Sequence, residues 1–205
     1  MRSTCGPAVL AASLSPGRGQ ESAGGTVWPV ANPDELNVPT PKAEADFWAL
    51  IEAAWARLGP EVRAARQELV VRPAGSPADT SAVKSARRAF LDVLAGSCRG
   101  MTSAELIDLD RVCERKLWEI DRADVHAVTQ GSDDGFLYAR GFIVAIGREF
   151  YDSVAADPRM GVPYAEWEEM CYFFAHLHHK RFGGFPDTCS GISRESGQNL
   201  LGWLS

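Results

Sequence analysis

Residues 102–120, TSAELIDLDRVCERKLWEI, carry the clearest structural signal in the chain. Apolar side chains recur there at steps of three or four residues, which is the period of an amphipathic helix. They are Leu106, Leu109, Cys113, Leu117 and Ile120. Thr102 and Glu105 have the spacing of a capping box, in which the hydroxyl accepts a free amide of the first turn and the carboxylate returns to the cap residue. The stretch therefore predicts a helix that begins beside Thr102.

The same period continues on both sides of this helix. Apolar stripes predict further helices over residues 47–58, 62–70, 83–94, 133–154 and 164–181. Proline, glycine and serine between them mark loops, and no stretch alternates strictly between apolar and polar residues as a half-buried strand does. The sequence therefore predicts an all-α protein with a single compact multi-helix domain.

The two ends of the chain differ in composition from this body. With 205 residues, the chain has room for about one domain. Residues 1–45 are rich in glycine, proline and serine, so we expect a flexible, disordered arm there. Residues 183–205 have a similar composition and are interpreted as a second flexible tail, although the apolar residues 200–204 could dock. The helical domain is expected over residues 46–182.

Charge and hydropathy exclude two classes of partner. Acidic residues outnumber basic ones by 27 to 21, so a nucleic-acid-binding function is not expected. No stretch approaches the roughly 20 apolar residues of a membrane span. The five cysteines include no Cys-x-x-Cys pair and are interpreted as reduced thiols, which favours a cytoplasmic location.

One motif resembles a known family. Residues 132–136 read Ser-Asp-Asp-Gly-Phe, and residues 47–51 read Phe-Trp-x-x-Ile. Together they resemble the bacterial domain of unknown function 4240 family over residues 46–158, although Ala139 stands where the family usually has an aromatic residue. The resemblance implies a fold and a bacterial origin. It supplies no activity and no catalytic residue.

The motif also contains candidate ligand-binding residues. Asp133 and Asp134 stand at a helix start, where Ser132 or Asp133 can cap unpaired amides, or where the two carboxylates can hold a metal ion or share a proton. On a continuous helix, Arg140 and Tyr151 fall on the same border of the apolar stripe as Asp133. That line of polar groups fits a small pocket, or an ion pair between Arg140 and an acid from another helix.

Three histidines follow near the end of the last predicted helix. His178 falls on its buried side and is a further candidate ligand-binding residue. His176 and His179 share the polar side and could chelate a metal, or serve as cations beside the helix C-terminus. Their spacing matches no established zinc motif, so no metal and no cofactor are expected.

These patterns leave two functions open. The leading hypothesis is a binding or accessory module without catalysis that engages a protein or a small molecule. The alternative is an enzyme or metal-dependent protein with a site around Asp133, Asp134 and Arg140, completed by His126 or His178. The sequence fixes neither the ligand nor the oligomeric state, and an accessory role in specialised metabolism stays open as well.

Overall fold

The predicted capping box organises the central helix, α5 (Ser103–Glu119). In the computed structural model, which describes residues 37–204, the Thr102 hydroxyl accepts the Glu105 amide at 3.3 Å. The Glu105 carboxylate accepts the Thr102 amide in return at 2.7 Å. Both partners of the capping box are therefore present, and this prediction is confirmed.

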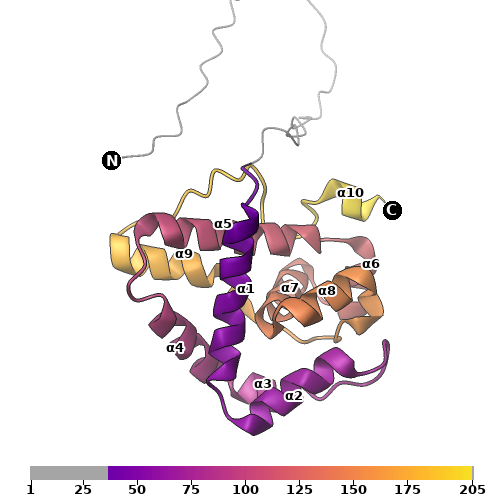
Figure 1. The fold of residues 1–205 in the computed structure, drawn as a ribbon. Helices are drawn as coiled ribbons and strands as arrows, with labels where there is room; N and C mark the ends of the chain where they lie inside the picture. Colours follow the sequence, from indigo (N-terminus) through magenta and orange to yellow (C-terminus); the bar gives the residue numbers. More distant parts are fainter. Residues whose placement is uncertain (1–36, 205) are drawn as a thin grey trace, which may run out of the picture.

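The described residues form α-helices, one 3-10 turn and no strand, so the all-α prediction is confirmed for this part of the chain. Besides α5, the helices are α1 (Pro41–Ala56), α2 (Pro60–Val71), α3 (Ser81–Ser85), α4 (Arg87–Ser97), α6 (Ala123–Thr129), α7 (Asp133–Ile146), α8 (Arg148–Ala156), α9 (Glu168–Phe182) and α10 (Leu200–Trp203), with the 3-10 turn η2 (Pro158–Met160) before α9. None of them is long and apolar enough to cross a membrane. Figure 1 shows α5 and α9 side by side, with α1 crossing them and α2 and α3 at the opposite end.

The single helix predicted over residues 133–154 is wrong, because Gly147 divides it into α7 and α8. Gly147 has a φ of +113°, a region that favours glycine. Arg66 of α2 donates from Nε to the carbonyl of Ile146 at 2.5 Å and pairs with Glu52 of α1. A Cβ on Gly147 would lie 2.4 Å from both side chains. The break therefore lets α1 and α2 cap the end of α7.

Other boundaries also differ from those predicted. Residues 83–94 form α3 and α4 rather than one helix, and α9 begins at Glu168 rather than near residue 164. The pattern of the sequence did not reveal α6 or α10. Of the arm expected over residues 1–45, the first 36 residues lie outside the described part, and α1 begins at Pro41.

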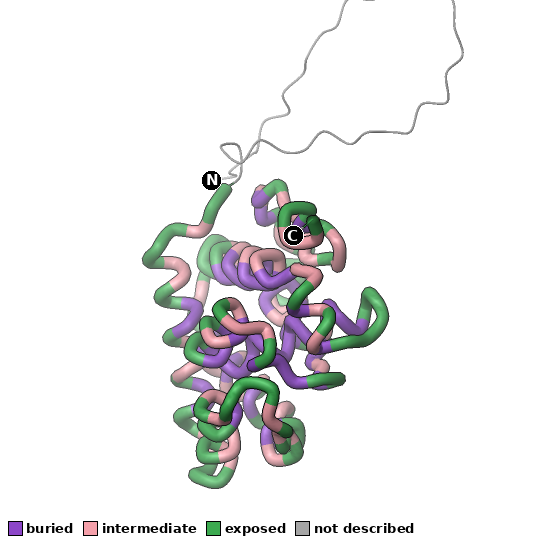
Figure 2. The backbone as a smooth tube through the Cα atoms, turned by 90° about the vertical axis from the view of Figure 1, so that its right-hand side faces the viewer, coloured by how far each residue is buried: buried purple, intermediate pink, exposed green. Residues whose placement is uncertain are grey.

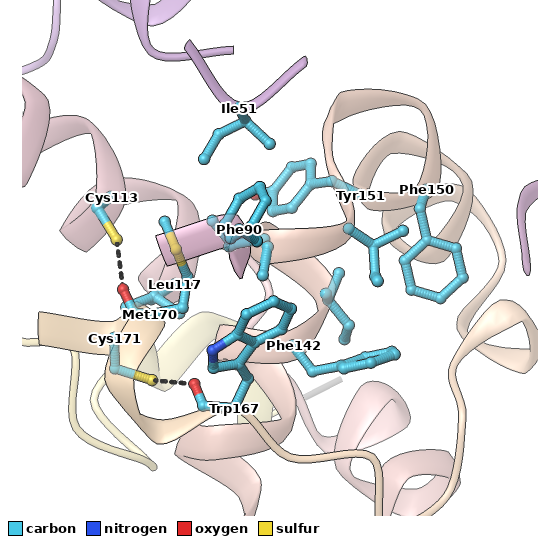
Figure 3. Packing of buried hydrophobic residues seen from close by; sticks show 14 of the residues in the cluster. Ile51, Phe90, Cys113, Leu117, Phe142, Phe150, Tyr151, Trp167, Met170 and Cys171 are labelled. Carbon is cyan, nitrogen blue, oxygen red and sulfur yellow. Dashed lines mark hydrogen bonds between the residues drawn. The ribbon is translucent and has the colours of Figure 1, made fainter. Parts of the chain in front are cut away.

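An aromatic cluster joins α1, α4 and α9 in the core. The Trp55 and Phe90 rings lie 4.5 Å apart, and Phe90 meets Trp167 edge-on at 5.3 Å. Figure 3 shows the rings of Phe90 and Trp167 near Phe142 of α7. Gly141 lets α7 approach α9, because a Cβ there would lie 2.5 Å from the Trp167 carbonyl oxygen. In Figure 2 the buried residues, in purple, gather toward the middle of the molecule, and exposed residues, in green, predominate at its outer turns.

Cys5 lies outside the described residues, and the other four cysteines fall into two groups. Cys98, Cys113 and Cys171 are free and buried. Cys189 is disulfide-bonded, so the expectation of reduced thiols is wrong for that residue. Burial raises the pKa of Cys98 to about 11 and that of Cys171 to about 12.

Residues 183–204, here called the C-terminal segment, lie against the helical domain. Gly183 ends α9 in the left-handed conformation, with a φ of +82°. From there the chain returns along α5 to α10, shown in yellow in Figure 1. Thr188, Ser190 and Asn199 of this segment are buried. The sequence left open whether the apolar residues 200–204 dock on the domain. Trp203 does so, because its ring packs against His126 and Phe136.

Candidate functional site

Four charged side chains lie buried beneath the C-terminal segment. Asp110 and Glu114 belong to α5, Asp121 follows its end, and Arg140 belongs to α7. Asp121 and Arg140 have no exposed surface at all. We call these four residues the polar cluster. Ionisable groups are rarely buried to this extent unless their charges and hydrogen bonds are matched by partners.

Asp121 binds the backbone of the C-terminal segment. Its carboxylate accepts the amides of Gly197, Gln198 and Asn199 at 3.1, 2.7 and 2.9 Å. It also accepts the indole N–H of Trp203 at 3.0 Å. Consecutive amides that converge on one carboxylate form a charge-assisted contact with main-chain atoms. Three of the four groups are therefore ones that any non-proline residue could supply.

Arg140 links the cluster to the end of α5. Its Nη1 donates to the carbonyl of Leu117 at 2.9 Å, and its Nη2 donates to the Ser196 hydroxyl at 2.9 Å. Nη2 lies 3.9 Å from Oδ1 of Asp121, and the guanidinium lies over the Phe136 ring. Burial lowers the pKa of Arg140, and the nearby Asp121 carboxylate partly opposes this. Of the two roles left open for Arg140, the structure shows the pairing with an acid.

Asp110 and Glu114 hold Arg194 of the C-terminal segment. Nη2 of Arg194 lies 3.0 Å from Asp110 and 3.4 Å from Glu114. Its Nη1 contacts the other Asp110 oxygen at 3.3 Å and donates to the Cys171 carbonyl at 2.6 Å. Burial raises the pKa of Asp110, while the charge of Arg194 acts in the opposite direction. Within residues 37–204, no other cation forms an ion pair with either acid.

Glu114 receives two further hydrogen bonds from the C-terminal segment. The hydroxyls of Thr188 and Ser190 both donate to its Oε2 atom at 2.6 Å. Each member of the polar cluster is thus bonded to at least one residue of the segment. One buried polar atom of the cluster, Nε of Arg140, has no hydrogen-bond partner among the described residues.

Tyr151, a sequence candidate, lies apart from the polar cluster. Its hydroxyl is 3.0 Å from both the Lys116 carbonyl and Glu119 Oε2, and Lys116 also pairs with Glu44 of α1. Burial, followed by the charge of Glu119, raises the pKa of Tyr151. Tyr151 and Arg140 thus donate to neighbouring carbonyls of α5, those of Lys116 and Leu117.

Asp133 and Asp134 are exposed in the first turn of α7. Ser132 caps that helix by accepting the amide of Gly135 at 3.3 Å. The backbone carbonyl of Asp133, rather than its carboxylate, connects to the polar cluster, because the Ser196 hydroxyl donates to it at 2.6 Å. The helix-start geometry supports a role for both acids in stabilising the amide end of α7.

The candidate histidines of α9 contact different partners. His178 Nδ1 lies 2.7 Å from the carbonyl of Gly184, and its Nε2 lies 2.7 Å from the Ser103 hydroxyl. Since a carbonyl can only accept, Nδ1 carries a proton, and a neutral ring accepts from Ser103. The ring of His179 stacks on Phe185, and His176 lies near the same ring. No group of three or more potential metal ligands occurs in residues 37–204.

A separate groove of about 490 Å³ lies between the first turns of α1 and α5. Leu50, Met101 and Leu109 supply apolar surface there. The charges at its rim already have partners, since Lys42 pairs with Asp46 and Asp108 pairs with Arg111. The groove therefore has apolar surface that a ligand can contact, but few polar groups that are not already paired.

A comparison with protein families identifies the family of this chain. A family model described as "Protein of unknown function (DUF4240)" matches residues 43–179, which is more than half of the chain. The chain belongs to this family. No curated protein and no solved structure matches it. The whole polar cluster lies within the DUF4240 region, whereas Arg194 and the rest of the C-terminal segment lie outside the matched residues.

The sequence did not point to Asp110, Glu114, Asp121 or Arg194. A signal for the first two was present in the DUF4240 region, because Asp110 and Glu114 are four residues apart and each directly follows an apolar residue of the predicted stripe. Such acids beside a core face indicate a buried cation. The identity of that cation depends on how the chain returns after α9, which helical periodicity does not encode.

Proposed function

We propose that this DUF4240 domain is a protein-binding module without catalysis, and that the polar cluster is its binding site for an extended polypeptide. The contact between Asp121 and three successive backbone amides supports this proposal most directly. A site that binds main-chain amides recognises polypeptide as such. The chain's own C-terminal segment serves as an example of the ligand.

The composition of the site also supports binding rather than a reaction. Each carboxylate in the polar cluster is engaged by a hydrogen-bond donor or a cation of the C-terminal segment. The three free cysteines among the described residues are buried, and burial raises the pKa of each, which disfavours a reactive thiolate. The disulfide at Cys189 is typical of an oxidising compartment, so the proposed function does not depend on the cytoplasmic location expected from the sequence.

A peptide-binding measurement tests the proposal. The receptor is the full-length chain with Arg194→Gln and Trp203→Ala, here called the released chain, because these changes remove two contacts of the C-terminal segment. The probe is a dye-labelled synthetic peptide with the sequence of residues 191–204. Fluorescence anisotropy should show saturable binding, and Asp121→Asn added to the released chain should weaken it about tenfold or more.

The circular dichroism spectrum of each receptor shows whether it is folded. A folded released chain that gives no saturable signal with up to 100-fold excess of peptide would overturn the proposal. If the released chain does not fold, Asn199→Ala replaces Trp203→Ala, because it removes the hydrogen bond from the Asn199 side chain to the Trp118 carbonyl and keeps the backbone amide that Asp121 accepts.

A further inference from the structure

The position of Arg194 carries more information than the backbone contacts. Its guanidinium meets both oxygens of Asp110, one oxygen of Glu114 and the carbonyl of Cys171. It also lies over the Tyr172 ring, 5.4 Å from the centroid. A planar fork of donors fits these acceptors, and a lysine ammonium, with three donors at one point, cannot reach the same set.

The domain side of this contact is unfavourable without a cation. Asp110 and Glu114 are one helical turn apart, and both are buried against α9 and the C-terminal segment. Like charges at that spacing repel each other, and a buried carboxylate without a partner destabilises the fold. The matched DUF4240 region thus contains a paired-acid pocket whose cation comes from outside that region.

The C-terminal segment is tethered by a disulfide at Cys189, and the residues that follow Cys189 have the form of a ligand that can leave. It joins the domain at Gly183 and Gly184, and a Cβ on either glycine would meet nothing within 4 Å. Only the four-residue α10 is regular within it, and Leu200, Leu201 and Leu204 remain exposed. The residues beyond Cys189 that contact the polar cluster are therefore held mainly by the polar contacts described above, with Trp203 as their apolar anchor.

On the basis of the proposed function, we propose that the polar cluster selects an arginine-bearing extended segment of another protein, and that the C-terminal segment competes for the same site in cis. Asp110 and Glu114 recognise the arginine side chain. Asp121 holds the backbone that follows it. An incoming segment gains access when it displaces Arg194 and the amides of residues 197–199.

Three versions of the 191–204 peptide test the arginine preference on the released chain. Position 194 carries arginine, lysine or citrulline, the last being a neutral residue of nearly the same shape as arginine. The arginine peptide should bind about tenfold or more tighter than the citrulline peptide, with the lysine peptide also weaker than the arginine peptide. Asp110→Asn in the released chain should reduce the ratio of arginine to citrulline affinity to near one.

Competition in cis is tested with the unmodified full-length chain. It should bind the arginine peptide about tenfold or more weakly than the released chain does, because its own segment occupies the polar cluster. Equal affinity of the two chains would overturn the competition. Equal binding of the arginine and citrulline peptides would overturn the arginine preference and leave the proposed function standing, whereas failure of every peptide to bind would overturn the proposed function itself.

Discussion

The Oδ1 atom of Asp121 lies 3.9 Å from Nη2 of Arg140, and both side chains are fully buried. At that separation the two groups neutralise each other without sharing a direct hydrogen bond. Both remain available to the C-terminal segment, which gives Asp121 its backbone amides and gives Arg140 the Ser196 hydroxyl. The Asp121–Arg140 pair therefore links the DUF4240 domain to the C-terminal segment through hydrogen bonds made by both side chains.

Asp121→Asn should destabilise the protein by about 3 kcal/mol, because it leaves the buried Arg140 charge without a counterion and removes acceptors from the segment. Urea unfolding at pH 7 measures the change. The matched control is Asp124→Asn, which alters a half-exposed carboxylate paired with Arg122 and should cost less than about 1 kcal/mol. Equal losses in the two variants would contradict the role given to Asp121.

Gly141→Ala should cost about 1–3 kcal/mol, because the new methyl group would lie 2.5 Å from both the Trp167 carbonyl oxygen and Cys171 Sγ. Thermal unfolding measures this loss. Gly96→Ala in α4 is the control, since its Cβ would meet nothing within 4 Å and alanine favours the helix. We expect the control to be neutral or slightly stabilising. If Gly141→Ala does not lower the melting temperature, α7 and α9 do not pack this closely.

The capping box predicts a dependence of stability on acid pH. The amide of Thr102, and then its hydroxyl, lower the pKa of Glu105. A carboxylate with a lowered pKa stabilises the folded state above its unfolded pKa of about 4.3, and this stabilisation is lost as the pH falls through the folded value. Glu105→Gln should therefore melt below the wild type at pH 7, with a smaller gap at pH 3. A gap that does not change between the two pH values would contradict the ionised cap.

The buried thiols predict a dependence on alkaline pH. Burial raises the pKa of Cys98 to about 11, against about 8.5 for a thiol in an unfolded chain. Because the unfolded state loses its proton first, the contribution of Cys98 to stability is present below about pH 8.5 and falls as the pH rises toward 11. The free energy of unfolding should drop less steeply from pH 8 to 10 in Cys98→Ala than in the wild type. Parallel profiles would exclude this thiol as a cause.

Helix-forming patterns made the fold largely predictable from sequence. The capping box at Thr102 and the apolar stripe of α5 are local features, and both appear in the structure as expected. The break at Gly147 was missed because it depends on Arg66 and Glu52, which reach it from two other helices. Periodicity records which face of a helix is apolar, but it does not record which distant side chain caps its end.

The candidate site was harder to predict for a related reason. Arg140 was a candidate because it falls on the same border of the predicted helix as Asp133, and the structure places it in the polar cluster. Asp121 and Arg194 lie outside any periodic or motif pattern, and their importance comes from a contact across more than 70 residues of sequence. Asp133 and Asp134 drew attention as a charged pair, yet their position in the first turn of α7 accounts for the two charges locally.

Hydrogen exchange at the amides of Gly197, Gln198 and Asn199 is the most direct measurement of whether the C-terminal segment occupies the polar cluster. In the wild-type protein, the account predicts exchange about 100-fold or more slower than in the free 191–204 peptide, and loss of this protection in Asp121→Asn. Exchange of these three amides at the rate of the free peptide in the folded wild-type protein would contradict it.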